Sequence, residues 1–301
     1  MNDGILLLNK GDNITSNAII NKIKYQLKDK GIKIDKIGHA GTLDPNALGL
    51  LIVLINGATK LSDYLILNDK EYIAEIELGR SYDTLDIWGK LDNEKTLNND
   101  DLLKIKEQID DALSSFVGEI DQIPPMYSSI KISGRRLYQI ARDNEIIDLS
   151  DKIRKVKIFK IERLNEPYLT EFNTIRFSIK CFVSKGTYIR SLARDIGIKL
   201  NLPSCMSSLV RTKSGKFSLD DAYTIDDILV GNYQLINMLD CIDDLYQFNA
   251  DDKVYNDCIN GRILKLNLDK EIIAIKYKDN LVAIYEYDKM NKLYKAKRVW
   301  K

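Results

Sequence analysis

The sequence predicts an α+β protein with two parts, a large one of residues 1–245 and a small β-rich one of residues 246–301. Predicted strands and helices follow one another without the regular strand–helix–strand alternation of a doubly wound fold. From about residue 247 onward the pattern changes to short strands separated by turns. The chain has 301 residues, 45% of them hydrophobic, which is enough for one large and one small domain.

The N-terminal part is expected to contain two strands and two helices. Residues 5–8 read as a buried strand and residues 9–13 as a polar turn. Ser16 is expected to cap a helix that ends at Gly31 and whose apolar positions recur every three or four residues. Those positions are Ile19, Ile20, Ile23 and Leu27. Residues 50–55 form an unbroken apolar run typical of a strand covered on both faces, and residues 59–67 read as a helix.

The following segments are assigned by the same rules. Alternation of polar and apolar residues predicts a half-buried strand over residues 71–78, and an amphipathic helix is expected over residues 101–116 of an acidic excursion. Residues 126–142 read as a strand, a turn at Ser133-Gly134 and a helix. Further strands are expected over residues 156–164, 175–183, 272–277 and 281–287, with a helix that begins near Thr187.

Charge is nearly balanced overall but unevenly distributed along the chain. The formal net charge is +1, yet residues 176–216 carry nine basic residues and one acid. Residues 217–260 carry ten Asp and one Lys, and residues 261–301 carry eleven basic and five acidic residues. A polyanion would contact the two basic stretches and avoid the acidic one. The alternative is that solvated faces simply differ in charge.

Cysteine usage and hydropathy exclude several classes of protein. The four cysteines lie far apart and include no CxxC pair, which indicates neither a zinc site nor a disulfide framework. The longest apolar run, residues 48–55, is too short to cross a bilayer, and the N-terminal segment does not read as a signal peptide. We therefore expect a cytoplasmic protein without a membrane partner.

Asp44 is the principal candidate for catalysis. An Asp followed by Pro is by itself a turn signal. The segment GHAGTLDPNALG, residues 38–49, matches the GHxGTLDPxAxG signature of the TruB family of tRNA pseudouridine synthases in identity and spacing. Residues 8–16, 70–79, 124–142, 184–197 and 209–217 resemble further segments of that family in the same order. The resemblance implies a mixed, largely antiparallel central sheet with flanking helices, followed by an RNA-binding module of PUA type.

The resemblance also implies a role for each matching residue. Asp44 would act at ribose C1′, by nucleophilic attack or by assisting elimination, while uridine is isomerised to pseudouridine. Arg190 would pair with Asp44, since a guanidinium can hold a carboxylate in a two-point hydrogen bond. Tyr72 would stack on the flipped uracil, with Tyr188 and Leu209 completing the pocket wall.

The remaining candidates concern RNA binding. His39 is the only histidine of the chain, so it cannot form a metal cluster, and the resemblance implies that it wedges into the RNA stack. The basic residues expected to contact the RNA are Lys10, Lys70, Arg135, Arg136 and Arg211, with Arg142, Lys185, Arg194, Lys213 and Lys216 as further phosphate contacts.

Three positions depart from the family pattern. Gly11 replaces a proline and Asn13 a glycine in the N-terminal turn, and Val210 stands where an arginine is expected. None of these changes affects Asp44 or its expected partner.

The expected activity is the conversion of uridine 55 in the T loop of tRNA to pseudouridine. The chemistry consumes no electrons, phosphate or metal, so no cofactor is expected. We expect a monomer that binds the T arm without a guide RNA. Two alternatives stay open at this point: the catalytic subunit of a guide-dependent particle, and a tRNA-folding chaperone that binds the elbow without essential catalysis.

Overall fold

The computed structural model describes residues 2–128, 130–132, 134–143, 145 and 147–300. Its main feature is a ten-stranded sheet. Those strands are β1 (Gly4–Lys10), β2 (Ile37–Ala40), β3 (Leu48–Ile55), β4 (Lys70–Leu78), β7 (Gly118–Gln122), β10 (Arg154–Arg163), β11 (Tyr168–Leu169), β12 (Ile175–Val183), β13 (Ser204–Ser214) and β14 (Phe217–Ser218). The order along the sheet is β1-β3-β13-β4-β12-β10-β7, with β2 beside β3, β11 beside β12 and β14 beside β13.

The sheet is mixed but largely antiparallel, as expected. Among the described residues of this sheet, β3 and β13 pair in parallel, whereas β13 runs antiparallel to β4 and β4 antiparallel to β12. A second sheet has the order β15-β16-β17-β18, and its strands are β15 (Tyr246–Asn249), β16 (Ile272–Tyr277), β17 (Asn280–Asp288) and β18 (Leu293–Val299). Two hairpins complete the strands: β5 (Arg80–Tyr82) with β6 (Leu91–Glu94), and β8 (Lys131–Ile132) with β9 (Arg135–Arg136). The α+β prediction is confirmed.

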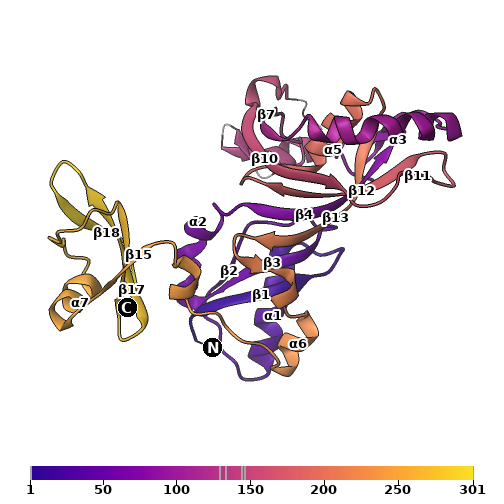
Figure 1. Cartoon of the computed structure of the whole chain (residues 1–301). Helices are drawn as coiled ribbons and strands as arrows, with labels where there is room; N and C mark the ends of the chain where they lie inside the picture. The colour runs from indigo at the N-terminus through magenta and orange to yellow at the C-terminus, as the bar shows by residue number, and fades with distance from the viewer. Residues whose placement is uncertain (1, 129, 133, 144, 146, 301) are drawn as a thin grey trace.

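Helices flank the large sheet on both halves. The α-helices of the described residues are α1 (Ser16–Asp29), α2 (Ser62–Leu65), α3 (Asn99–Ser114), α4 (Leu137–Arg142), α5 (Ile189–Lys199), α6 (Ile225–Val230) and α7 (Asp252–Ile259), of which α7 packs against β17 and β18 of the second sheet. Short 3-10 helices are η1 (Asn56–Leu61), η2 (Ser150–Lys152), η3 (Leu219–Asp221) and η4 (Leu239–Ile242). Figure 1 shows β4 and β13 between the half of the sheet near α3 and α5 and the half near α1 and α6.

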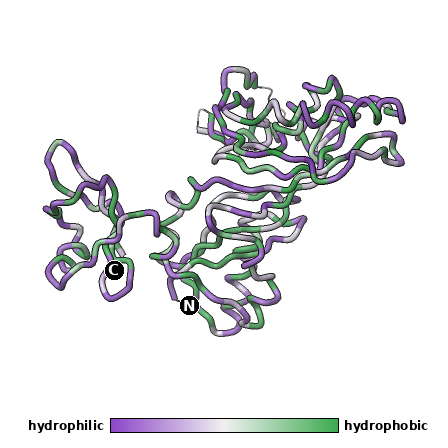
Figure 2. The backbone as a smooth tube through the Cα atoms, in the orientation of Figure 1, coloured by the Kyte–Doolittle hydropathy of each residue, from purple (hydrophilic) through white to green (hydrophobic). Residues whose placement is uncertain are grey.

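Two hydrophobic clusters lie against the large sheet. One packs α1, α3 and α5 against strand residues such as Leu51, Ala74 and Ile179. The other lies against the alternate residues of β1 and β3, such as Leu50 and Ile52, because successive side chains of a strand point to opposite faces. The central strand β3 is therefore covered on both faces, as predicted. Figure 2 shows hydrophobic residues gathered along these central strands.

The C-terminal sheet shares the second cluster with β1 and β3. Ile284 and Trp300 belong to it, and the Trp300 indole donates a hydrogen bond to the Gly57 carbonyl at 2.8 Å. Arg298 forms an ion pair with Asp63 at 2.8 Å. The β-rich segment is thus packed against the large sheet.

Several predicted elements differ in detail from the observed ones. The helix expected over residues 59–67 is a 3-10 turn, η1, followed by the single turn α2. Thr15, not Ser16, caps α1 by accepting a hydrogen bond from the Ala18 amide, because Ser16 is buried against another loop. Ser133 lies outside the described residues. No helix of the described part is long and apolar enough to span a membrane.

Candidate active site

The loop between β2 and β3 carries Asp44 and depends on two glycines. Gly41 has φ +84° and Gly49 has φ +95°, a region that L side chains rarely adopt. A Cβ atom on Gly49 would lie 2.4 Å from the backbone oxygen of Arg211. Both positions therefore require glycine, which gives this part of the signature a physical reason.

Two side chains from the N-terminal segment hold the loop on either side of Asp44. The Lys10 ammonium is fully buried and donates to the carbonyls of Pro45 at 2.8 Å and Ala47 at 2.7 Å. The Ser16 hydroxyl donates to the Leu43 carbonyl and accepts from the Leu43 amide, both at 2.9 Å. These bonds fix the backbone immediately before and after the carboxylate.

Arg211 on β13 holds the outer ends of the same loop. Its guanidinium donates to the Gly41 carbonyl at 2.9 Å and to the Leu50 carbonyl at 2.8 Å. The residue is only 1% exposed. Since the interior strengthens hydrogen bonds to charged groups, the Asp44 loop is pinned from two separate parts of the chain.

Arg190, on the first turn of α5, is the direct partner of Asp44. Its Nη2 atom lies 2.9 Å from Asp44 Oδ2. The same guanidinium donates to the Tyr127 carbonyl at 2.8 Å and to the Thr84 carbonyl at 2.9 Å. The Arg190 side chain is 6% exposed and that of Asp44 is 44% exposed. The carboxylate can therefore be reached by a substrate, while its counter-ion is held inside the protein.

Asp86 is a second carboxylate on Arg190, and the sequence analysis did not identify it. Its Oδ2 atom lies 3.6 Å from Arg190 Nη1, and its Oδ1 atom accepts hydrogen bonds from Thr84 Oγ1 at 2.6 Å and the Trp88 amide at 3.2 Å. Burial raises the pKa of Asp86, and the Thr84 bond and the Arg190 charge oppose that shift. Thr-x-Asp in a turn is an ordinary pattern, so no signal in the sequence marks this residue.

Tyr72 and Tyr188 lie close enough to Asp44 to interact with its charge, and Leu209 lies on the strand next to that of Tyr72. Tyr72 on β4 is 8% exposed, and burial raises the pKa of its phenol, an effect that the nearby Arg211 charge opposes. Leu209 on β13 is buried opposite Ala74. Tyr188 immediately precedes α5, and its backbone is held by the Gln122 side chain, which accepts from its amide at 2.8 Å and donates to its carbonyl at 3.1 Å. An oriented carboxylate beside flat apolar surfaces suits chemistry at a sugar whose base must be held.

Comparisons with known proteins show the family of the chain. A family model described as TruB family pseudouridylate synthase (N terminal domain) matches residues 29–189. The tRNA pseudouridine synthase B of Streptococcus sanguinis (strain SK36) is 38% identical over 306 residues, which cover 99% of each chain. That of Staphylococcus aureus (strain MSSA476) is 44% identical over 228 residues, covering 76% of this chain and 72% of the relative. The chain belongs to the TruB family. It is therefore an enzyme of the isomerase class that makes pseudouridine.

Solved structures support the same fold at lower identity. The archaeal box H/ACA sRNP Nop10-Cbf5 complex contains a chain with 23% identity and a TM-score of 0.65, covering 99% of this chain and 85% of that one. An H/ACA RNP bound to a substrate RNA containing 2'-deoxyuridine contains a chain with 22% identity and a TM-score of 0.64 over the same shares.

Three of the basic residues expected to contact RNA are buried in the free protein, where they bind its own backbone. Lys10 and Arg211 hold the Asp44 loop, as described above. Lys70 is 7% exposed and donates to the carbonyls of Ile66 at 2.9 Å and Asn68. Burial lowers the pKa of Lys10 and of Lys70 to about 8. A TruB family member thus uses these cations to fix its own backbone.

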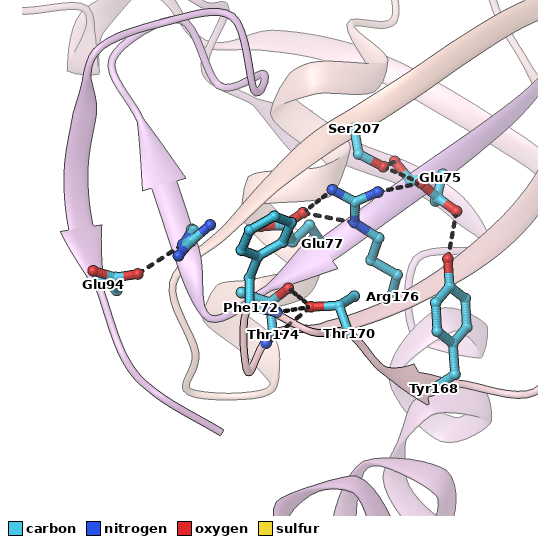
Figure 3. Close-up of polar contacts among 10 residues, drawn as sticks. Glu75, Glu77, Glu94, Tyr168, Thr170, Phe172, Thr174, Arg176 and Ser207 are labelled. Atoms are coloured by element: carbon cyan, nitrogen blue, oxygen red, sulfur yellow. Dashed lines mark hydrogen bonds and ion pairs between the residues drawn. The ribbon is translucent and has the colours of Figure 1, made fainter. Parts of the chain in front are cut away.

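The basic stretch of residues 176–216 is also not a single surface stripe. Figure 3 shows Arg176 between two acids of β4, with its Nε atom 2.7 Å from Glu77 and Nη1 3.4 Å from Glu75. Arg176 is thus neutralised by ion pairs, and Arg190 and Arg211 are buried. These three basic residues of the stretch do not offer a free positive charge to RNA.

Arg135, Arg136 and His39, three further RNA-binding candidates, lie on two separate elements. Arg135 and Arg136 are exposed on the β8–β9 hairpin, where Arg135 pairs with Asp143 and, at 2.9 Å, with Glu145. His39 lies on β2. Burial, and to a smaller extent the nearby Arg211 charge, lower the pKa of its imidazole, which is therefore neutral near pH 7. The buried Nδ1 atom of His39 makes no hydrogen bond among the described residues. His39 therefore offers an uncharged ring.

The departures in the N-terminal turn are accommodated locally. Asn13 has φ +55°, the left-handed region that a glycine would occupy and that asparagine tolerates best among other residues. Gly11 contributes its carbonyl to the Lys10 ammonium at 2.8 Å. The turn thus still presents Lys10 to the Asp44 loop.

Proposed function

We propose that this enzyme converts uridine 55 in the T loop of tRNA to pseudouridine, with Asp44 as the catalytic carboxylate. The observation that carries the proposal is the 2.9 Å pair between Asp44 and the buried guanidinium of Arg190, in a member of the TruB family. The curated relatives that share most of this chain are named tRNA pseudouridine synthase B, which supports tRNA as the substrate.

The reaction assigns a distinct task to each residue of the site. It breaks the bond from ribose C1′ to base N1, turns the bound base and joins C1′ to C5, after which C5 loses its proton and N1 takes one up. Asp44 acts at C1′, by nucleophilic attack or by assisting elimination. Arg190 orients the carboxylate, because a guanidinium has a fixed fork of donors. Tyr72 stacks on the base, while Tyr188 and Leu209 form the pocket wall.

RNA binding involves further elements of the chain. His39 occupies the gap that the flipped nucleotide leaves in the RNA stack, and Arg135 and Arg136 contact the backbone of the T arm. Residues 1–245 form the catalytic domain and residues 246–301 a PUA-like RNA-binding module. The protein acts in the cytoplasm as a monomer, without a guide RNA.

The test is a mapping experiment on RNA. Purified protein is incubated with an unmodified tRNA transcript, without added RNA or metal, and pseudouridine is mapped at each position. We expect a single modification, at position 55. Asp44→Asn should abolish it while tRNA affinity stays within about threefold, since the carboxylate acts on the reacting sugar more than on the RNA as a whole. Modification elsewhere would contradict the position, and none at all would favour the chaperone alternative.

A further inference from the structure

Trp88 is an exposed residue on the turn whose Asp86 lies against the catalytic arginine. The chain has two tryptophans, of which Trp300 is 7% exposed and Trp88 is 47% exposed. A single exposed aromatic residue is common on protein surfaces and by itself indicates nothing. Trp88 differs from other exposed aromatic residues because its turn contacts Arg190 and because its backbone is held by hydrogen bonds.

Trp88 is connected to Asp44 by three successive contacts, through Asp86 and Arg190. Its amide donates to Asp86 Oδ1 at 3.2 Å, and the other oxygen of Asp86 lies 3.6 Å from Arg190. Arg190 in turn lies 2.9 Å from Asp44. Trp88 therefore belongs to the same turn as Asp86, the second carboxylate on Arg190.

The turn that carries Trp88 is rigidly held at its tip. The Ile87 amide donates to the Met206 carbonyl of β13 at 3.2 Å. A Cβ atom on Gly89 would lie 2.2 Å from Thr84 Oγ1, so the turn is closed tightly around Asp86. These contacts fix the backbone of Trp88 before any ligand binds.

The base of the β5–β6 hairpin is fixed as well. The Nε atom of Arg80 lies 2.7 Å from Glu94 Oε1, and its guanidinium lies 5.4 Å from the centre of the Phe172 ring. Figure 3 shows Glu94 and Phe172 at this end of the hairpin. An aromatic side chain on a fixed support loses little entropy on binding, which favours its use as a contact surface.

We propose that Trp88 is a stacking platform for a nucleobase of the substrate RNA next to the uridine that is isomerised. When that uridine leaves the stack, the neighbouring base loses a stacking surface, and an indole can replace it because every base has a flat π face. This inference rests on the proposed function, since its ligand is the RNA on which the enzyme acts.

Steady-state kinetics on a T-arm stem-loop RNA test the proposal. Trp88→Ala should raise KM about tenfold or more, the loss typical of one base–aromatic stack, and change kcat much less. Trp88→Phe should restore most of the affinity, because a phenyl ring still stacks. Leu91→Ala is the matched control, since Leu91 is 45% exposed on the same hairpin and should leave KM unchanged. A KM for Trp88→Ala equal to that of Leu91→Ala would overturn the inference.

Tryptophan fluorescence gives an independent reading without turnover. In Asp44→Asn protein, the stem-loop should quench the emission of the exposed indole, and the added change Trp88→Phe should remove that quenching. Quenching that persists without Trp88, or no quenching while the RNA binds, would refute the stacking contact. Wild-type protein that forms pseudouridine in the same assay separates a failure of this inference from a failure of the proposed function.

Discussion

Replacement of Arg190 by lysine retains the positive charge but removes the fork of donors. The guanidinium reaches four acceptors: Asp44 Oδ2 at 2.9 Å, the Tyr127 carbonyl at 2.8 Å, the Thr84 carbonyl at 2.9 Å and Asp86 Oδ2 at 3.6 Å. An ammonium has one nitrogen and three donors, so it cannot occupy the positions of both Nη1 and Nη2. Arg190→Lys therefore loses either the contact with Asp44 or the contacts toward Thr84 and Asp86.

The expected magnitude follows from these contacts. A hydrogen bond to a charged group contributes about 1.5–3 kcal/mol, and at least one such bond is lost or misdirected in the variant. If about 3 kcal/mol of that stabilisation belongs to the transition state, kcat falls on the order of 100-fold. Because the site is buried, the free energy of unfolding should also fall, by about 3 kcal/mol.

Single-turnover kinetics, with saturating enzyme over limiting tRNA, measure this effect, with circular dichroism as a check on folding. Arg194→Lys is the control, because Arg194 lies one turn further along α5 and donates to the Ile123 carbonyl at 3.2 Å without touching the site. That variant should retain its rate. A folded Arg190→Lys protein within a few-fold of the wild-type rate would refute the role given to the guanidinium fork, which contacts Asp44 through Nη2 and Thr84 through Nη1.

Three further predictions concern the supports of the site. Burial lowers the pKa of Lys10 to about 8, so between pH 8 and 10.5 the unfolded chain binds more protons at Lys10 than the folded protein does. The free energy of unfolding of wild type relative to Lys10→Met should therefore rise by up to about 3 kcal/mol across that range. A difference between the two proteins that stays constant with pH in denaturant titrations would contradict this prediction. Gly49→Ala, whose Cβ would lie 2.4 Å from a backbone oxygen of β13, should lower the melting temperature and abolish activity, whereas Gly11→Ala, with no atom within 4 Å, should do neither. Trp300→Ala should cost about 3 kcal/mol of stability in urea unfolding, while Met290→Ala, at 93% exposure, should cost nothing measurable; equal midpoints for the two would show that the C-terminal sheet does not stabilise the core.

Much of the fold could be predicted because its elements have clear periodicity. The apolar positions of α1 and the unbroken run in β3 identify one half of the sheet. The helix α3 begins within two residues of its prediction, since Asn98 and Asp101 form a reciprocal cap at its start. Apolar periodicity and helix caps depend on neighbouring residues, so the elements that they predict are found in the structure.

The central strand β13 was not predicted, for a physical reason. Its pairing with β4 has register shifts between Met206 and Ser208 and between Arg211 and Lys213. Each bulge adds a residue and breaks the period of two on which strand recognition depends. Its polar residues also find partners inside the protein, such as Ser207, which donates to Glu75. The helix α7 was missed too, within a segment expected to be mainly strands.

In the candidate site, too, some contacts could be predicted from sequence motifs and others could not. The pairing of Asp44 with Arg190 was expected from two separate motifs, and the structure brings them to 2.9 Å. The burial of Lys10 and Arg211 could not be predicted, because their partners are carbonyl oxygens, which are present at every residue. A basic residue that reads as an RNA contact in the sequence can equally be a donor to the protein's own backbone.

This use of buried cations bears on how the carboxylate acts. Asp44 is nearly half exposed and belongs to a loop without regular structure, so on its own its position would vary between conformers. Lys10 and Arg211 together donate to carbonyls on both sides of it, and Arg190 contacts the carboxylate itself. Catalysis that depends on one carboxylate at one sugar carbon requires this placement before the substrate arrives, because misplacement by about 1 Å can cost on the order of 100-fold in rate. The charges that RNA recognition could have used are therefore committed to positioning, and recognition falls to exposed groups such as Arg136 and, by our inference, Trp88.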